Sequence, residues 1–225
     1  MRYIDLTGPL CNDMWQFGEP FPVLRVEAKK GYKDGFGEFS FTAIDGLHAL
    51  TGTYVETPAH YFGHEKSFMI ADVPLDKLMD LDCVVLNVEA KKDGNGRERI
   101  EKDDLLACAN SGAIRKGDAL LVGTGWGDKM WRDQGHFPMS PYFSYDAFMW
   151  LLEHEPCLIG SDTSCWDDLS NPSGLFEKFY RQNILMLAGL KNLSAVKAER
   201  VKLTMLPILL ENSCAAPCRA VVMEE

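Results

Sequence analysis

Apolar and β-branched residues gather in short runs separated by turn residues, and this pattern predicts six strands. The runs span residues 3–7, 39–44, 83–89, 119–125, 157–163 and 219–223. Between them, apolar spacing and composition predict helices at 74–79, 101–110, 144–155 and 174–190. Strands that alternate with helices predict an α/β fold with a mixed sheet.

The helix predicted at 144–155 has both a start signal and a stop signal. Phe148, Leu151 and Leu152 recur at i, i+3 and i+4 behind the N-cap candidate Ser144, and Pro156 follows the segment. The charged, glycine-rich stretch 91–99 predicts a turn between neighbouring elements. Because no stretch has the composition of a linker, we expect residues 1–225 to form one domain.

The net charge of the chain argues against some classes of binding partner. Thirty-three acidic residues against twenty-three basic ones give a net charge of -10, which repels nucleic acid and anionic membrane. The longest apolar runs, such as 183–190 and 203–210, are far shorter than a membrane span, and the N-terminus lacks a signal-peptide pattern. We therefore expect a cytoplasmic protein whose partner is a small molecule.

The seven cysteines are an odd number, and several lie in apolar stretches, which is typical of buried thiols. Cys214 and Cys218 stand close together in "CAAPC", but no second Cys or His pair follows to complete a zinc site. We expect this pair to be structural. No cysteine is next to a histidine in the sequence, and there is no G-x-S-x-G elbow.

The segment "HALTGTYVETPAHYF" at 48–62 is typical of a loop that carries chemistry, because it is rich in polar groups and lacks helical or strand periodicity. Gly52 and Pro58 restrict its backbone. We predict that the side chains of Glu56 and His60 converge here in a pocket.

Within this segment, "TGTYVETPAH" resembles the signature H-x-G-T-H-x-D-x-P-x-H of the cyclase family, which includes bacterial kynurenine formamidase and isatin hydrolase. Gly52, Thr53, Pro58 and His60 match it. The resemblance continues, in the family's order, through "IDLTGPL", "VPLDKLMDLDCVVLNV", "KGDALLVGTGW", "LIGSDTSCWDD" and "LPILLENSCAAPCRAVV". It implies the family's α/β fold, a mixed sheet with swivelling β/β/α character.

The departures from the family lie at its metal ligands. The resemblance assigns metal ligation to positions that are Leu50, Tyr54 and Glu56 here, and a later ligand pair to Phe176 and Ala188. It assigns proton transfer to the position of His60. Because catalytic zinc takes about three protein ligands and a water, a metal site in the family's geometry is not expected.

Other donors lie close to Glu56 and His60 in the sequence. His64 extends the spacing to Glu56-x3-His60-x3-His64, and His48 precedes the signature. Pro58 opposes a regular helix that would align the three. We expect a divalent metal such as zinc or manganese to be either weakly bound through Glu56, His60, His48 and His64 or absent.

Three further residues are candidates for substrate binding. The Tyr54 hydroxyl can replace metal contacts with hydrogen bonds. Asp162 follows an apolar strand in "GSDTSCWDD" and either contacts the substrate or caps backbone N–H groups. Trp126 belongs either to the core or to an aromatic pocket for a flat ring, together with Trp15, Phe17, Trp131 and Trp166. His136, in a loop, is expected to pack or cap.

Two functional hypotheses follow. The first is a divergent cyclase-family hydrolase that cleaves an amide, cyclic amide or ester bond, with His60 and Glu56 as catalytic residues. The second is a metal-free pseudoenzyme or small-molecule-binding protein that retains the fold. The resemblance also implies a homo-oligomer, and the aromatic segment containing Trp15, Phe17, Phe21 and Pro22 is typical of an exposed interface.

Overall fold

The structure is a computed structural model that describes residues 1–94 and 96–224. The strands are β1 Arg2–Asp5, β2 Arg25–Lys33, β3 Gly37–Asp45, β4 Tyr54–Glu56, β5 Leu81–Asn87, β6 Lys91–Lys92, β7 Glu98–Ile100, β8 Ala119–Gly123, β9 Tyr142–Phe143, β10 Leu158–Ser161, β11 Leu185–Ala188, β12 Val201–Pro207 and β13 Ala215–Glu224. The α-helices are α1 Ala59–Phe62, α2 Lys102–Leu106, α3 Trp126–Met130, α4 Tyr145–Glu153 and α5 Leu175–Tyr180. Short 3-10 helices span Ile70–Asp72, Leu75–Lys77, Ser111–Ala113 and Leu193–Ala195.

The main sheet has eight strands in the order β1-β13-β12-β5-β8-β10-β11-β4. Strand β4 also pairs with β13, so the strands from β13 to β4 close into a barrel. Neighbours among β5, β8, β10 and β11 are parallel, and the other pairs of the sheet are antiparallel. The predicted α/β fold with a mixed sheet is confirmed.

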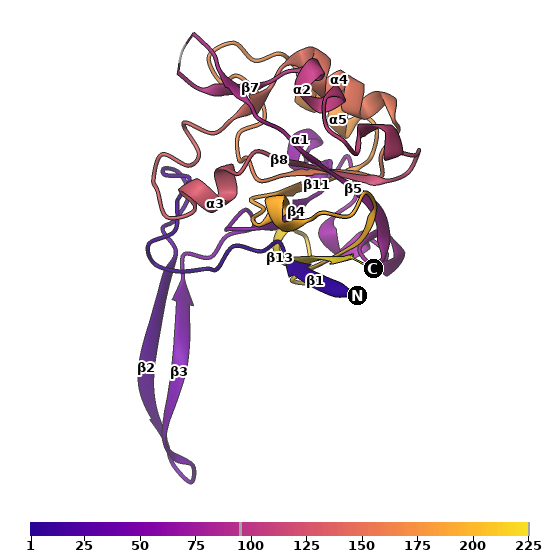
Figure 1. The fold of residues 1–225 in the computed structure, drawn as a ribbon. Coiled ribbons are helices and arrows are strands. Elements are labelled where there is room, and N and C mark those ends of the chain that lie inside the picture. The colour runs from indigo at the N-terminus through magenta and orange to yellow at the C-terminus, as the bar shows by residue number, and fades with distance from the viewer. Residues whose placement is uncertain (95, 225) are drawn as a thin grey trace.

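Apolar side chains cover both faces of the central strands. On β8, Leu120 and Val122 pack into one core cluster, while Ala119 and Leu121 pack into a second cluster on the other face. Helices α2, α4 and α5 lie on the face of the sheet that carries the first of these clusters (Figure 1). A strand buried on both faces needs a continuous apolar run, which is why "ALLVG" has no polar alternation.

Helix α4 begins where the sequence predicts. The Ser144 hydroxyl accepts a hydrogen bond from the Ala147 N–H at 3.3 Å, and Phe148 and Leu151 are fully buried against the sheet. Within the described residues, no helix has both the length and the apolar character needed to cross a bilayer.

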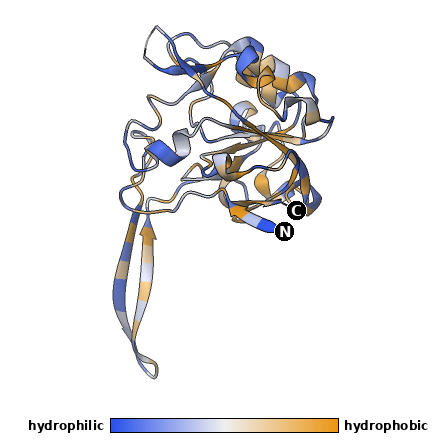
Figure 2. Cartoon of the chain, viewed as in Figure 1, coloured by the Kyte–Doolittle hydropathy of each residue, from blue (hydrophilic) through white to orange (hydrophobic). Residues whose placement is uncertain are grey.

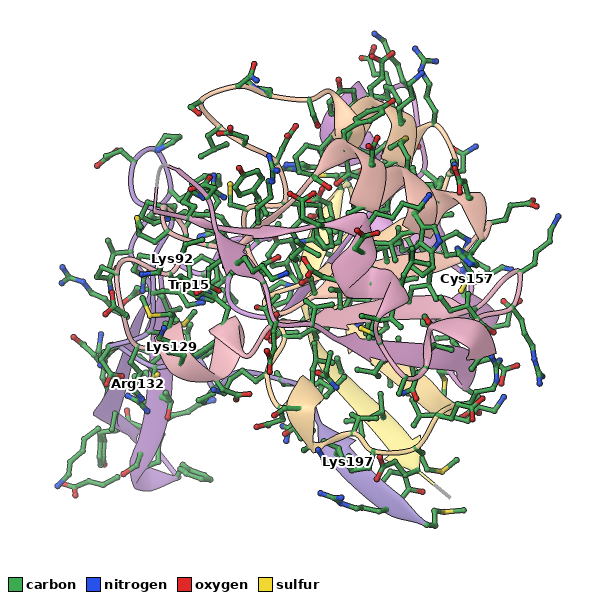
Figure 3. The ribbon with its side chains drawn as sticks, turned by 45° about the horizontal axis from the view of Figure 1, so that its top comes forward. Trp15, Lys92, Lys129, Arg132, Cys157 and Lys197 are labelled. Atoms are coloured by element: carbon green, nitrogen blue, oxygen red, sulfur yellow. The ribbon has the colours of Figure 1, made fainter. Side chains whose placement is uncertain are left out.

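The hairpin formed by β2 and β3 projects away from the rest of the molecule (Figure 1). Hydrophobic residues recur along it (Figure 2), and Tyr32 and Phe36 are 70% and 73% exposed. Asn12 fixes its base through two hydrogen bonds to the backbone of Val26. Trp15 and Arg132 lie at the end of the body from which the hairpin leaves (Figure 3).

All six predicted strands are present, but β2, β4, β6, β7, β9, β11 and β12 were not predicted. The prediction of one helix over 174–190 is wrong beyond α5, because β11 occupies 185–188. A buried apolar run of this length carries no periodicity that separates helix from strand. The segment at 74–79 contains a single 3-10 turn. At 91–99, β6 and β7 pair in a hairpin, and Asn95 lies outside the described residues.

Candidate active site

The segment that resembles the cyclase signature closes the barrel. Strand β4 lies between β11 and β13, with Tyr54 opposite Ala188 and Glu56 opposite Ala215. Gly52 adopts a φ of 72°, in the left-handed region that favours glycine. The Thr53 hydroxyl donates to the Gly189 carbonyl at 2.6 Å. These contacts fix the backbone that carries Glu56.

Glu56 and His60 converge, as predicted. Strand β4 ends at Glu56, and α1 begins directly after Pro58, which places His60 one turn beyond the strand. The distance from His60 Nε2 to Glu56 Oε2 is 3.9 Å. The Glu56 side chain is 4% exposed, whereas that of His60 is 42% exposed. The imidazole therefore reaches solvent while its carboxylate neighbour remains buried.

The environment shifts the pKa values of the two groups in opposite directions. Burial raises the pKa of Glu56 to about 7, although a hydrogen bond donated by the Tyr180 hydroxyl acts in the opposite direction. Burial lowers the pKa of His60, and the nearby His64 lowers it further. A carboxyl group and a neutral imidazole with such pKa values are suited to exchange protons with a substrate.

A cavity of about 390 Å³ contains both side chains. Its walls are mostly aromatic and apolar, and its lining residues are Phe17, Phe21, Leu50, Tyr54, Glu56, His60, Tyr61, Phe137, Ser164, Phe176, Tyr180 and Met186. Pockets of this size, apolar with a few polar groups, are typical of small-molecule sites.

The N-terminal aromatic segment contributes to this cavity. Trp15 is only 1% exposed, and Phe17 and Phe21 are part of the cavity wall. Trp15 is therefore buried rather than exposed, whereas Phe17 and Phe21 are partly exposed and pack against each other with ring centroids 5.1 Å apart. That this segment forms an interface stays a prediction.

The positions that the resemblance assigns to metal ligands also gather here. Leu50, Tyr54 and Phe176 line the cavity, and Ala188 lies opposite Tyr54 in the sheet. Their side chains offer no donor except the Tyr54 phenol, whose pKa burial raises well above its ordinary value. Across residues 1–94 and 96–224, no three His, Cys, Asp or Glu side chains are grouped to hold a metal. These donors do not fit a catalytic zinc or manganese ion.

The other two predicted metal ligands, His48 and His64, do not line the cavity. His48 Nδ1 accepts a hydrogen bond from the Leu50 N–H at 3.3 Å, and its ring packs on Phe21. Gly63, with a φ of 94°, ends α1 before His64, so the spacing of four residues does not continue along one helix face. Of the four predicted ligands, the structure brings together Glu56 and His60.

Asp162 and Trp126 also lie outside the cavity lining. The buried Asp162 carboxylate accepts hydrogen bonds from the Thr124 N–H at 2.9 Å and the Thr124 hydroxyl at 3.0 Å, and burial raises its pKa to about 6. Trp126 donates its indole N–H to the His136 carbonyl at 2.9 Å. In the structure both residues hold the loop after β8.

Two side-chain contacts at the site were not predicted from the sequence. Tyr180, rather than Tyr54, donates to Glu56. Ser164 Oγ lies 2.8 Å from Nε2 of His136, which is fully buried. Burial lowers the pKa of His136 to about 4, so this imidazole is neutral at physiological pH and anchors Ser164 in the cavity wall.

A cysteine also lies beside His60, contrary to what the sequence suggested. Cys214 Sγ is 3.6 Å from His60 Nδ1. All seven cysteines are free thiols, and Cys83, Cys165 and Cys218 are buried as expected, but Cys214 is partly exposed. The two residues meet because β13 pairs with β4, which no local sequence pattern reveals.

The sequence model of the family described as "Putative cyclase" matches residues 4–168. The chain belongs to the cyclase family. A search of curated proteins finds no match.

Solved structures show the same fold over nearly the whole chain. A structure described as a predicted metal-dependent hydrolase from Bacillus stearothermophilus is 21% identical, with 98% of this chain and 97% of that chain covered and a TM-score of 0.74. Isatin hydrolase A from Ralstonia solanacearum is 19% identical, with coverage of 100% and 92% and a TM-score of 0.80. An isatin hydrolase bound to the product analogue thioisatinate is 20% identical, with coverage of 98% and 91% and a TM-score of 0.76.

Proposed function

We propose that this cyclase-family protein hydrolyses an amide, cyclic amide or ester bond in a small aromatic molecule. The observation that carries the proposal is the convergence of Glu56 and His60, 3.9 Å apart, inside a cavity with aromatic walls. Similarity in fold to structures described as isatin hydrolases supports the same reaction class.

The cavity wall favours a flat, apolar substrate with one polar reacting group. Phe17, Phe176 and Tyr61 offer ring faces and edges to an aromatic substrate. Tyr54 keeps its proton because burial raises its pKa, so its hydroxyl is available to donate a hydrogen bond to a substrate carbonyl.

His60 is the proton carrier in this proposal. Its lowered pKa keeps it neutral and able to accept a proton from the attacking group, which it then returns to the leaving nitrogen or oxygen. Glu56 lies beside Nε2 and stabilises the imidazolium that forms, and Tyr180 holds that carboxylate in place. No step is assigned to a metal, because the donors do not fit one.

The test is hydrolysis by the full chain after dialysis against EDTA, with N-formylkynurenine, isatin and 4-nitrophenyl acetate as substrates. We expect at least one substrate to be hydrolysed at a rate that EDTA treatment leaves unchanged. His154→Ala is the matched control and should keep that rate, because the His154 ring contacts the Trp150 carbonyl on α4 and does not line the cavity. Hydrolysis that is absent until zinc or manganese is added back would contradict the proposal.

The second candidate function is ligand binding without catalysis. Leu50, Phe176 and Ala188 favour it, because apolar groups at former ligand positions preserve a pocket while removing metal chemistry. Calorimetric binding of isatinate or kynurenine with no turnover of any of the three substrates would favour this function over hydrolysis.

We also propose that the chain self-associates through the β2–β3 hairpin. The rings of Phe36, Phe39 and Phe41 follow one another with centroids 5.8 and 5.9 Å apart, and Phe36 and Phe41 are exposed. A projecting hairpin with exposed aromatic residues is costly in water and is typical of an interface.

Sedimentation tests the proposed association. Wild-type protein at micromolar concentration should sediment as an oligomer, and a Phe36→Ser, Phe41→Ser double variant should shift toward monomer. Leu209→Ser is the control, because Leu209 is 76% exposed and lies outside the hairpin. Wild-type protein that sediments as a monomer would contradict the proposal.

A further inference from the structure

Cys214 is fixed against the signature segment by the sheet. Its neighbour Ala215 pairs with Glu56, and the Cys214 carbonyl accepts hydrogen bonds from the Thr57 N–H at 2.8 Å and the Thr57 hydroxyl at 3.1 Å. The backbone on both sides of the contact is therefore held by strand pairing and by Thr57. The position of the thiol beside His60 is a property of the barrel closure.

The thiol, the imidazole and the carboxylate form a continuous row. Cys214 Sγ lies 3.6 Å from Nδ1 of His60, and Glu56 Oε2 lies 3.9 Å from Nε2 of the same ring. The two ring nitrogens thus face different partners. This order, in which a base separates a nucleophile from a carboxylate that orients the base, recurs in enzymes that form covalent acyl intermediates.

Cys214 adjoins the cavity through its contact with His60 rather than as part of the lining. We propose that Cys214 is the nucleophile of this hydrolase, and that Cys214, His60 and Glu56 act as a thiol–imidazole–carboxylate triad. This inference rests on the proposed function, which by itself leaves the attacking group open. It also supplies a route to hydrolysis that requires none of the donors missing from the metal-ligand positions.

The reaction needs no reagent other than water. The Cys214 thiol gives its proton to His60 Nδ1 as Sγ forms a bond to the substrate carbonyl carbon. The carbon–nitrogen or carbon–oxygen bond then breaks, and the leaving group takes the proton from His60. Water attacks the resulting thioester and gives a proton to His60, which passes it to Sγ as the carbon–sulfur bond breaks.

The environment of Cys214 makes deprotonation of its thiol depend on His60. Burial, together with the nearby charge of Glu56, raises the pKa of the Cys214 thiol, so it does not ionise alone near neutral pH. Attack then requires proton transfer to His60 during the reaction. Loss of His60 should therefore slow acylation of Cys214 itself, which a merely structural cysteine would not show.

The chain contains two matched control cysteines. Cys11 and Cys108 are also partly exposed free thiols. Their sulfurs contact the carbonyl oxygens of Pro9 at 3.5 Å and Asn87 at 3.3 Å, whereas Cys214 contacts an imidazole. A difference in reactivity between Cys214 and these two thiols reports on the neighbouring histidine.

The experiment is acylation of the EDTA-treated full chain by 4-nitrophenyl acetate, with release of nitrophenolate followed over time and the acetylated cysteine identified by peptide mass spectrometry. We expect acetylation of Cys214 at least about tenfold faster than that of Cys11 or Cys108, and a similar loss of this advantage in His60→Ala. Cys108→Ala should keep the wild-type time course, and Cys214→Ala should lose the fast phase.

The possible outcomes separate this inference from the proposed function. If Cys214 reacts no faster than the control thiols in wild-type protein, or if His60→Ala leaves its rate unchanged, the triad is wrong. If Cys214→Ala still hydrolyses isatin or N-formylkynurenine at the wild-type rate, the triad fails while the hydrolase function stands. Fast acylation of Cys214 that depends on His60, without turnover of any substrate, supports the triad and contradicts the hydrolase function.

Discussion

Two histidines contribute to the cavity in different ways, His60 directly and His136 through Ser164. His60 is partly exposed, its Nε2 lies 3.9 Å from the Glu56 carboxylate, and its Nδ1 lies 3.6 Å from the Cys214 thiol. His136 is fully buried between Trp15 and Trp126, contacts the Ser164 hydroxyl, and leaves Nδ1 without a partner among the described residues.

The difference shows how the surroundings divide roles between identical side chains. Burial lowers the pKa of both imidazoles, and at His136 it lowers the pKa to about 4. His60 differs in that Glu56 Oε2 lies 3.9 Å from its Nε2. We therefore expect His60 to carry protons and His136 to hold the cavity wall. Substitution of His60 should therefore mainly lower activity, and substitution of His136 should mainly lower stability.

The largest effect on activity is expected for His60→Ala. Removing the proton carrier should lower the rate of hydrolysis by about 100-fold or more. The free energy of unfolding should change by less than about 1 kcal/mol, because the side chain is 42% exposed. Kinetics and urea denaturation of the same preparation measure both quantities. A variant that loses stability but keeps its rate would reverse the roles assigned to the two histidines.

His136→Ala should show the opposite balance. Deleting a fully buried ring that packs against Trp15 leaves a cavity and should lower the free energy of unfolding by about 2–4 kcal/mol. Where the variant is still folded, its rate should stay within about tenfold of wild type, because Ser164 loses its anchor but the proton carrier remains. A 100-fold loss of rate in folded protein would give His136 a catalytic role instead.

Glu56→Gln tests the buried carboxyl group that lies beside His60. The folded pKa of about 7 lies above the ordinary value of 4.5, so the carboxyl group stabilises the fold fully below about pH 4.5, and that contribution is lost as pH rises through 7. Relative to the uncharged Gln variant, the wild type should lose up to about 3 kcal/mol of stability between pH 4.5 and 8.5. Urea denaturation across this range measures the difference, and a difference independent of pH would show that Glu56 titrates normally.

Tyr180→Phe has the smallest expected effect. The Tyr180 hydroxyl donates to Glu56, and the variant removes that donor from a buried carboxyl group. Stability at pH 8 should fall by about 1–2 kcal/mol, and the pKa of Glu56 should rise above its wild-type value. Carbon-13 NMR of the glutamate carboxyl groups follows the titration. An unchanged pKa would mean that the hydrogen bond from Tyr180 does not affect the pKa of Glu56.

Local patterns in the sequence determined β5, β8, β10 and α4, because an apolar run such as 119–123 and a cap such as Ser144 act through neighbouring residues. The signature segment, identified by resemblance, located Glu56 and His60 and the family to which the chain belongs. It also indicated that metal ligands are missing, since residue identity alone decides whether a side chain can bind an ion.

Only the tertiary structure decided what surrounds that pair. The closure of the barrel by β4, between β11 and β13, brings Cys214 to His60 across 154 positions of sequence separation. Tyr180 reaches Glu56 across 124 positions. Such contacts depend on the register of distant strands, and register is set by the packing of the whole sheet rather than by any local spacing. The same long-range packing buries Trp15, turns Phe17 and Phe21 toward the cavity, and makes the latter part of 174–190 a strand.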